Sequence, residues 1–217
     1  MFPRPGAVIF DCDGVLLDSE RAMAELWCEG LRAAGGTISI EQWLTRITGL
    51  SGFRQRVHDE LGVSVTDAEW AAIQASEPEA LAAVTAVPGM PEAVGAVNVP
   101  RCVASSSGLE RLHRTLSTAG LLALFTPHVY SASQVARGKP APDLFLHAAA
   151  SLGVEARACV VVEDSIHGVA AARAAGMRVV AFAGGSHIVP AVRERLGASG
   201  ADALADDAAE LRAILGF

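Results

Sequence analysis

Five short apolar runs, rich in valine and isoleucine, are spaced along the chain, and segments with apolar residues at helical spacing separate the later ones. Short buried strands that alternate with amphipathic helices are typical of a parallel sheet with helices on both faces. In such sheets, ligands bind beyond the carboxyl ends of the strands. The sequence therefore predicts an α/β core whose strands are residues 7–10, 102–104, 128–131, 159–162 and 179–182.

Local signals place the helices of this core. Ser107 and Glu110 have the S-x-x-E spacing of a capping box, which predicts a helix start. Pro142 suits the first turn of another helix, and Gly153 suits its end. A further helix is expected over residues 169–175, where Gly176 follows.

Residues 20–86 interrupt this alternation and contain no strand-like run. Met23, Trp27 and Leu31 fall on one helical face, and further helices are expected at residues 41–47, 52–61 and 67–84. An insert directly after the first strand would lie over the end of the sheet. We predict a Rossmann-like parallel-sheet core, residues 1–18 and 87–217, with an inserted all-helical cap domain, residues 19–86.

Two aspartates, Asp11 and Asp13, follow the first strand with one residue between them. Two carboxylates this close repel each other, and each resists desolvation, so the pair requires a cation or a shared proton. Aspartates also cap turns and helices after strands, and this alternative is open at the level of the two residues alone.

Two later segments are also expected at the edge of the sheet where the carboxyl ends of the strands meet. Ser105 and Ser106 leave the second strand as hydroxyls beside a helix start, a setting suited either to an oxyanion or to an ordinary cap. Lys139 lies between a glycine and a proline and is the only lysine in the sequence. The other residues counted as lysine or arginine are all arginine. A compact ammonium enters a crowded anionic pocket more readily than a planar guanidinium, although one lysine can also survive by chance.

Glu163 and Asp164 follow the fourth predicted strand, which delivers two more carboxylates to the same edge of the sheet. Four carboxylates that face one lysine imply a hard divalent cation. Oxygen ligands with an open side suit Mg²⁺ that holds a phosphate.

These segments together resemble the haloacid dehalogenase superfamily of phosphohydrolases, in the helical-cap subfamily of β-phosphoglucomutase and phosphoglycolate phosphatase. The resemblance covers nearly the whole chain. Each motif is weak alone, but their order and their positions after strand-like runs make the set specific. The four motifs are Asp11-x-Asp13-Gly14-Val15, Ser105, Lys139 and Glu163-Asp164.

The resemblance implies a role for each motif residue. Asp11 would be the nucleophile that becomes an aspartyl-phosphate, and Asp13 the general acid and later the general base. The groups implied to bind the phosphate are Ser105, Ser106, Lys139 and the backbone amides of Cys12 and Asp13. The groups implied to hold Mg²⁺ are Asp11, Asp164 and the carbonyl of Asp13, with Glu163 close by.

The expected activity is Mg²⁺-dependent hydrolysis of a sugar phosphate, a phosphosugar acid such as 6-phosphogluconate, or phosphoglycolate. A β-phosphoglucomutase-type mutase is the alternative, but its histidine after the first motif is replaced near Met23 and its basic cap loop differs at residues 48–54. A non-catalytic binding or regulatory protein is a second alternative. A decayed copy would have lost at least one of the catalytic motif residues, and all are present.

The cap offers two candidate substrate contacts. Arg54, in a glycine-flanked loop, is expected to bind a second anionic group such as a carboxylate. Glu20 either faces the cleft or favours the first turn of a helix. None of the six histidines shows paired metal spacing, and we assign them no role.

Composition limits the partners. A formal net charge of −7 without any basic run argues against nucleic acid and anionic membrane as partners. No apolar stretch approaches the roughly 18 residues of a membrane span. The four scattered cysteines are expected to be packed thiols. We expect a cytoplasmic monomer or weak dimer whose partner is a small phosphorylated metabolite.

Overall fold

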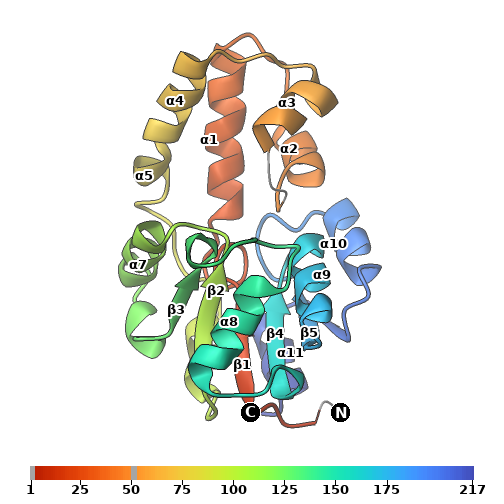
Figure 1. Cartoon of the computed structure of the whole chain (residues 1–217). Helices are drawn as coiled ribbons and strands as arrows, with labels where there is room; N and C mark the ends of the chain where they lie inside the picture. Colours follow the sequence, from red (N-terminus) through yellow and green to blue (C-terminus); the bar gives the residue numbers. More distant parts are fainter. Residues whose placement is uncertain (1–2, 50–52) are drawn as a thin grey trace.

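The computed structural model describes residues 3–49 and 53–217, and its centre is a parallel sheet (Figure 1). Within this described part, the sheet has six strands in the order β3-β2-β1-β4-β5-β6. The five predicted strands are confirmed, whereas β6 was missed because Ala-Leu-Ala has no β-branched residue. The strands are β1 (Ala7–Phe10), β2 (Arg101–Ser105), β3 (Val129–Ser131), β4 (Cys159–Glu163), β5 (Arg178–Phe182) and β6 (Ala203–Ala205).

Helices cover both faces of the sheet. One face packs on α6 (Met90–Ala96), α7 (Leu109–Thr118) and α11 (Ala208–Leu215). The opposite face packs on α8 (Asp143–Leu152), α9 (Ile166–Ala174) and α10 (Pro190–Gly197). Short 3-10 turns lie at Leu122–Leu124, Ala132–Gln134 and Ala156–Ala158.

The two-residue period of β1 explains why both faces are apolar. Val8 and Phe10 point into one hydrophobic cluster, and Ala7 and Ile9 point into the other. A strand that is buried on both faces has a continuous apolar sequence, as residues 7–10 have. All four cysteines are buried and free, as predicted.

In the described residues of the insert after β1, the regular elements are all helices, and they lie over the carboxyl ends of the strands (Figure 1). The predicted single helix over residues 67–84 is wrong, because it breaks at Ser76. Pro78 stands in the first turn of the second piece, where its missing N–H is tolerated. Gly52, the predicted start of another helix, lies outside the described residues. The helices are α1 (Glu20–Ala33), α2 (Ile40–Arg46), α3 (Phe53–Leu61), α4 (Asp67–Ala75) and α5 (Glu77–Ala80).

Three tryptophans form the centre of this cap. Trp27 stacks on Trp43 with the ring centroids 5.9 Å apart, and its centroid lies 4.4 Å from that of Trp70. All three are buried. Large aromatic side chains supply much of the apolar area that a small helical insert can bury.

Two strand-like segments connect the cap to the sheet. The Asp18 amide donates to the Thr85 carbonyl at 3.0 Å, and the Val87 amide donates to the Leu16 carbonyl at 3.0 Å. The domain boundaries at residues 18 and 87 remain a prediction. Among the described residues, no helix combines the length and the apolar character needed to cross a membrane.

Candidate active site

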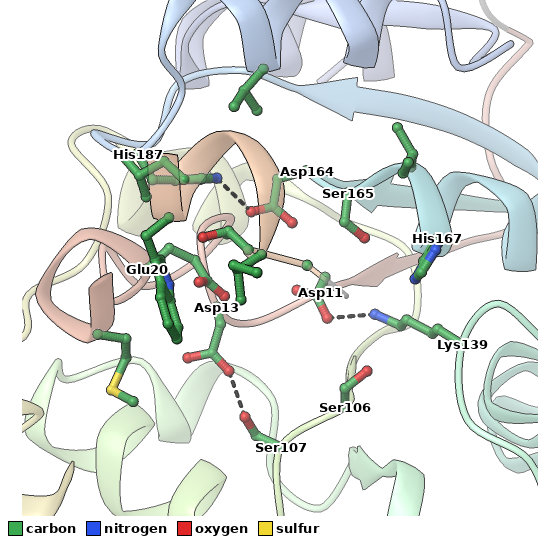
Figure 2. Close-up of a pocket in the computed structure, with 18 of the residues that line it drawn as sticks. Asp11, Asp13, Glu20, Ser106, Ser107, Lys139, Asp164, Ser165, His167 and His187 are labelled. Carbon is green, nitrogen blue, oxygen red and sulfur yellow. Dashed lines mark hydrogen bonds and ion pairs between the residues drawn. The ribbon is translucent and has the colours of Figure 1, made fainter. Parts of the chain in front are cut away.

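A cavity of about 440 Å³ lies between the carboxyl ends of the central strands and the cap (Figure 2). The core contributes polar side chains that follow β1, β2 and β4, and the cap contributes an apolar wall that includes Trp27 and Trp43. Strand β1 lies between β2 and β4, so the direction of chain winding reverses beside it. Such a switch point is where open parallel sheets bind ligands.

Asp11 stands at the base of this cavity. Its amide donates to the Val162 carbonyl at 2.9 Å, which extends the pairing of β1 with β4 by one residue. The carboxylate accepts from Lys139 Nζ at 2.5 Å. Burial raises the pKa of Asp11 well above its ordinary value, and the Lys139 ammonium opposes this rise.

Lys139 is held between two carboxylates. Its Nζ also donates to Glu163 Oε1 at 2.5 Å and lies 4.9 Å from the centre of the Phe145 ring. The lysine side chain is only 5% exposed. Burial alone would lower the pKa of Lys139, but Asp11 and Glu163 outweigh burial and raise it, so the side chain carries a positive charge.

Glu163 is fixed at the amino end of α9. Its Oε2 accepts from both the amide and the hydroxyl of Ser165, at 2.9 Å each. A Cβ at Gly168 would lie 1.9 Å from the Glu163 carboxyl group, so only glycine allows the carboxylate to rest against the helix. Glu163 therefore holds Lys139 in place beside Asp11.

The described residues contain one group of acidic ligands suited to a metal ion, Asp11, Glu163 and Asp164. One oxygen from each lies within 4.8 Å of the others, and all three residues are buried. An all-oxygen set of buried carboxylates fits a hard cation such as Mg²⁺. The predicted carboxylates from β1 and β4 thus do lie together.

Asp164 has a partner that the sequence analysis missed. His187 Nε2 lies 2.9 Å from Asp164 Oδ2, and Figure 2 shows the two side chains facing each other. Burial lowers the pKa of His187, which favours a neutral imidazole. A Cβ at Gly14 would lie 1.9 Å from Asp164 Oδ2, and Gly14 has a φ of +80°, so this turn requires glycine.

Asp13 accepts from three side chains. Ser19 Oγ and Ser107 Oγ each donate at 2.6 Å, and Arg111 Nη2 donates at 3.2 Å. Burial raises the pKa of Asp13, but Arg111 and the two hydroxyls outweigh burial and bring it below its usual value. The carboxylate form is therefore favoured in this arrangement.

The predicted capping box at Ser107 is wrong. Helix α7 starts at Leu109 after Gly108, with no side-chain cap. The Ser107 hydroxyl donates to Asp13 instead, as Figure 2 shows. The helix begins one residue later than predicted, with Gly108 at the N-cap position, so Ser107 stands outside it and its hydroxyl bonds to a charged acceptor.

The remaining predicted phosphate-binding residues lie around Asp11. Ser105 is buried at the end of β2, where its hydroxyl accepts from the Ser107 amide at 3.1 Å, and it lines the cavity. Ser106 also lines the cavity and is exposed. The Cys12 side chain packs in the hydrophobic core, so only its backbone is available to a ligand.

Glu20, at the start of α1, lines the cavity. Burial, with a further contribution from the nearby charge of Asp13, raises the pKa of Glu20 to about 8. At neutral pH this carboxyl group is therefore protonated and can donate a hydrogen bond into the cavity.

The raised pKa of Glu20 predicts that the free energy of unfolding falls as pH rises. Between pH 4.5, the ordinary pKa of a glutamate, and about pH 8, Glu20 holds a proton in the folded state but not in the unfolded state. The free energy of unfolding should therefore fall, relative to Glu20→Gln, by up to about 1.4 kcal/mol per pH unit in that window. Urea unfolding with EDTA between pH 5 and 8 measures this difference. Glu29→Gln, exposed on the same helix, is the control, and parallel pH profiles for wild type and Glu20→Gln would contradict the assignment.

Arg54 is not among the described residues that line the cavity, and its contact with substrate remains a prediction. Its Nη2 pairs with Asp67 Oδ1 at 2.6 Å, and its guanidinium lies 5.3 Å from the centre of the Trp70 ring. Residues 50–52 of the same predicted substrate loop lie outside the described residues. Gly49 does approach the core, because a Cβ there would lie 3.0 Å from the Ser165 Cβ.

Several buried polar atoms at the cavity lack a hydrogen-bond partner among the described residues. All of the side chains that carry them line the cavity. Buried polar groups are normally paired, so these atoms are available to a ligand or to water. They are Thr48 Oγ1, Arg111 Nε, His167 Nδ1 and His187 Nδ1.

Comparison with known proteins agrees with this geometry. The model of the haloacid dehalogenase-like hydrolase family matches residues 5–176. A 6-phosphogluconate phosphatase of Escherichia coli K12 is 28% identical over 197 residues, which is 89% of each chain. Hexitol phosphatase A of the same organism is 34% identical over 179 residues, or 80% of this chain and 81% of that protein.

A solved structure shows the same architecture. A conserved haloacid dehalogenase-like protein of unknown function from Agrobacterium tumefaciens strain C58 is 38% identical and superposes with a TM-score of 0.90. The alignment covers 97% of both chains, so it includes the cap as well as the sheet.

Proposed function

The chain belongs to the haloacid dehalogenase-like hydrolase family, and we propose that it is a Mg²⁺-dependent phosphatase that hydrolyses a small phosphomonoester through an aspartyl-phosphate on Asp11. The observation that carries this proposal is the contact between Asp11 and Lys139 at the cavity between the sheet and the cap. A buried carboxylate beside a buried ammonium suits nucleophilic attack on a phosphate dianion, because the ammonium offsets the repulsion.

The proposed first step transfers the phosphoryl group to Asp11. One Asp11 oxygen forms a bond to phosphorus while the bond between phosphorus and the leaving oxygen breaks. Asp13, once it has taken a proton from solvent, gives that proton to this oxygen, so the product leaves as an alcohol. Lys139 and Ser105 hold the phosphoryl oxygens during transfer.

The proposed second step restores the enzyme. Asp13, now a carboxylate, takes a proton from water, and the water oxygen attacks phosphorus. The bond between phosphorus and Asp11 breaks, which releases inorganic phosphate. The three hydrogen bonds that Asp13 accepts support this carboxylate form.

The residues proposed to hold Mg²⁺ are Asp11, Asp164 and the carbonyl of Asp13, with Glu163 close by. The bound ion would supply positive charge against the phosphate and orient it for in-line attack. The cluster of buried acidic oxygens supports this assignment.

The cap side of the cavity favours an uncharged leaving group, because its one partly buried cation among the described residues is already paired. Arg111, which lines the cavity, is shared by Asp13 and Glu77. Two further arginines that line the cavity, Arg46 and Arg195, are exposed, where an ion pair contributes little. We therefore propose a neutral sugar or polyol phosphate as substrate, ahead of phosphoglycolate or a phosphosugar acid.

We expect the purified protein with Mg²⁺ to release phosphate from small phosphomonoesters and to lose this activity in EDTA. The panel contains hexose and hexitol phosphates, 6-phosphogluconate, phosphoglycolate and β-glucose 1-phosphate, with free phosphate measured. Neutral substrates should have kcat/KM at least about tenfold above the anionic ones, because a second negative charge would approach Glu77 while Arg111 is already paired with Asp13 and Glu77. Activity restored by Mg²⁺ after EDTA is the control for unfolding.

Two outcomes would overturn parts of this proposal. Glucose 6-phosphate formed from β-glucose 1-phosphate without phosphate release would establish the mutase alternative. Absence of Mg²⁺-dependent turnover across the panel, in a folded protein, would favour a binding or regulatory protein.

A further inference from the structure

One guanidinium joins a core carboxylate to a cap carboxylate. Arg111 of α7 places Nη2 at 3.2 Å from Asp13 Oδ1 and Nη1 at 3.5 Å from Glu77 Oε2. Asp13 follows β1, and Glu77 begins the cap helix α5. The bridge therefore spans the gap between the two parts of the molecule, at the wall of the cavity.

The bridge is shielded from water more than an ordinary surface ion pair. The side chains of Arg111, Asp13 and Glu77 are 24%, 12% and 23% exposed. Partly buried charges interact more strongly than exposed ones, because less solvent screens them. Without the guanidinium, Asp13 and Glu77 would be two partly buried carboxylates of like charge with no cation between them.

The geometry depends on the shape of the arginine side chain. A planar guanidinium presents donors in two directions at once, whereas the ammonium of lysine is a point charge. Trp27, at the centre of the cap, also hydrogen-bonds to Glu77. The contact with Arg111 thus connects the packed interior of the cap to the carboxylate of Asp13.

Asp13 has two other donors, the hydroxyls of Ser19 and Ser107. Arg111 shares Oδ1 with Ser19, while Ser107 takes Oδ2. Loss of Arg111 would leave hydroxyls that can rotate and would remove the one charged donor to this carboxylate among the described residues. A displacement of about 1 Å in a reacting group can cost on the order of a hundredfold in rate.

We propose that Arg111 is a positioning residue through which the cap, by way of Glu77, orients the Asp13 carboxyl group for proton transfer to the leaving oxygen. This inference rests on the function proposed above. A positioning role differs from a purely structural one in a measurable way. Loss of Arg111 should slow the reaction most where the leaving group needs a proton.

The test compares two leaving groups. The sugar or polyol alkoxide of the best panel substrate needs a proton, whereas p-nitrophenolate leaves without one. The parameter is kcat/KM, which includes only the steps up to loss of the leaving group. For Arg111→Gln we expect kcat/KM to fall by about ten- to a hundredfold on the alkyl phosphate and by less than about threefold on p-nitrophenyl phosphate. Glu77→Gln should show the same pattern with a smaller loss.

A double variant tests whether Arg111 acts through Asp13. In the Asp13→Asn background, Arg111→Gln should cause little further loss, because residues that act as one unit are not additive. Arg111→Lys should recover part of the activity on the alkyl substrate, and it replaces Arg111→Gln if that variant does not fold. Arg114→Gln, exposed on the same helix, is the matched control and should behave as wild type.

The outcomes separate this inference from the function it rests on. Three results would each overturn the positioning role: equal losses on both substrates, additive effects with Asp13→Asn, or wild-type kinetics for Arg111→Gln. The proposed function would still stand in these cases, provided that the wild-type protein shows Mg²⁺-dependent phosphatase turnover. Absence of Mg²⁺-dependent turnover in wild type and in Arg114→Gln would overturn both.

Discussion

Asp11→Asn is expected to leave a folded protein whose phosphatase turnover has fallen at least about a thousandfold. The amide keeps the shape of the side chain but cannot form the acyl-phosphate. Asp11 lies where a nucleophile is required, since it lines the cavity and its carboxylate is 2.5 Å from Lys139 Nζ. Phosphate release at saturating substrate measures the loss.

Stability and trapping experiments complete this prediction. The substitution removes one carboxylate from a buried acidic cluster, so the free energy of unfolding in the absence of Mg²⁺ should not fall greatly. Acid quenching of wild type with labelled substrate should trap protein-bound phosphate, which Asp11→Asn should lack. Asp59→Asn, exposed on α3, is the control. Substantial Mg²⁺-dependent turnover in Asp11→Asn would rule out the covalent mechanism.

The position of Asp11 could be predicted because it depends on a general property of parallel sheets. All carboxyl ends of the strands meet at one edge, so polar residues directly after apolar runs must come together there. The same argument placed Ser105 after β2 and Asp164 after β4, and the order of the strands sets both beside β1. These predictions needed only the strands and their direction.

His187 could have been found by the same argument and was missed. His187 follows Phe182, the last residue of β5, by five residues, and so it reaches the same edge of the sheet. Paired metal-binding spacing does not identify it, because its partner is the Asp164 carboxylate. Its position after a strand predicts its place at the site, as the position of Asp11 does.

The cap contacts could not be predicted in this way. The sequence around Arg54 predicts a substrate loop, but Arg54 lies in α3 and its guanidinium pairs with Asp67, thirteen residues further along the chain. Arg111 does have a local signal, since it lies in the first turn of α7, the helix that follows Ser107. Glu77, its cap partner, has none, because that contact depends on how the cap rests on the core.

Lys139→Arg is expected to lower kcat/KM by at least about tenfold, although it conserves the charge. The lysine is 5% exposed, and Asp11 and Glu163 each lie 2.5 Å from its Nζ. A guanidinium is broader than an ammonium, so it must displace Asp11, Glu163 or the phosphate. The ring of Phe145, 4.9 Å from Nζ, limits movement on another side. Steady-state kinetics on the best substrate measures the effect.

Lys139→Ala should be more severe, with a loss of at least about a hundredfold in kcat/KM. It leaves Asp11 and Glu163 buried without their shared cation, and loss of one partner from a buried ion pair costs about 3–5 kcal/mol of stability. Mg²⁺ should restore part of that stability in urea unfolding, because it offsets the same carboxylates. Arg137→Lys, two residues away and 69% exposed, is the matched control. Wild-type kinetics in Lys139→Arg would mean that the only lysine is an accident of composition and that other residues bind the phosphate.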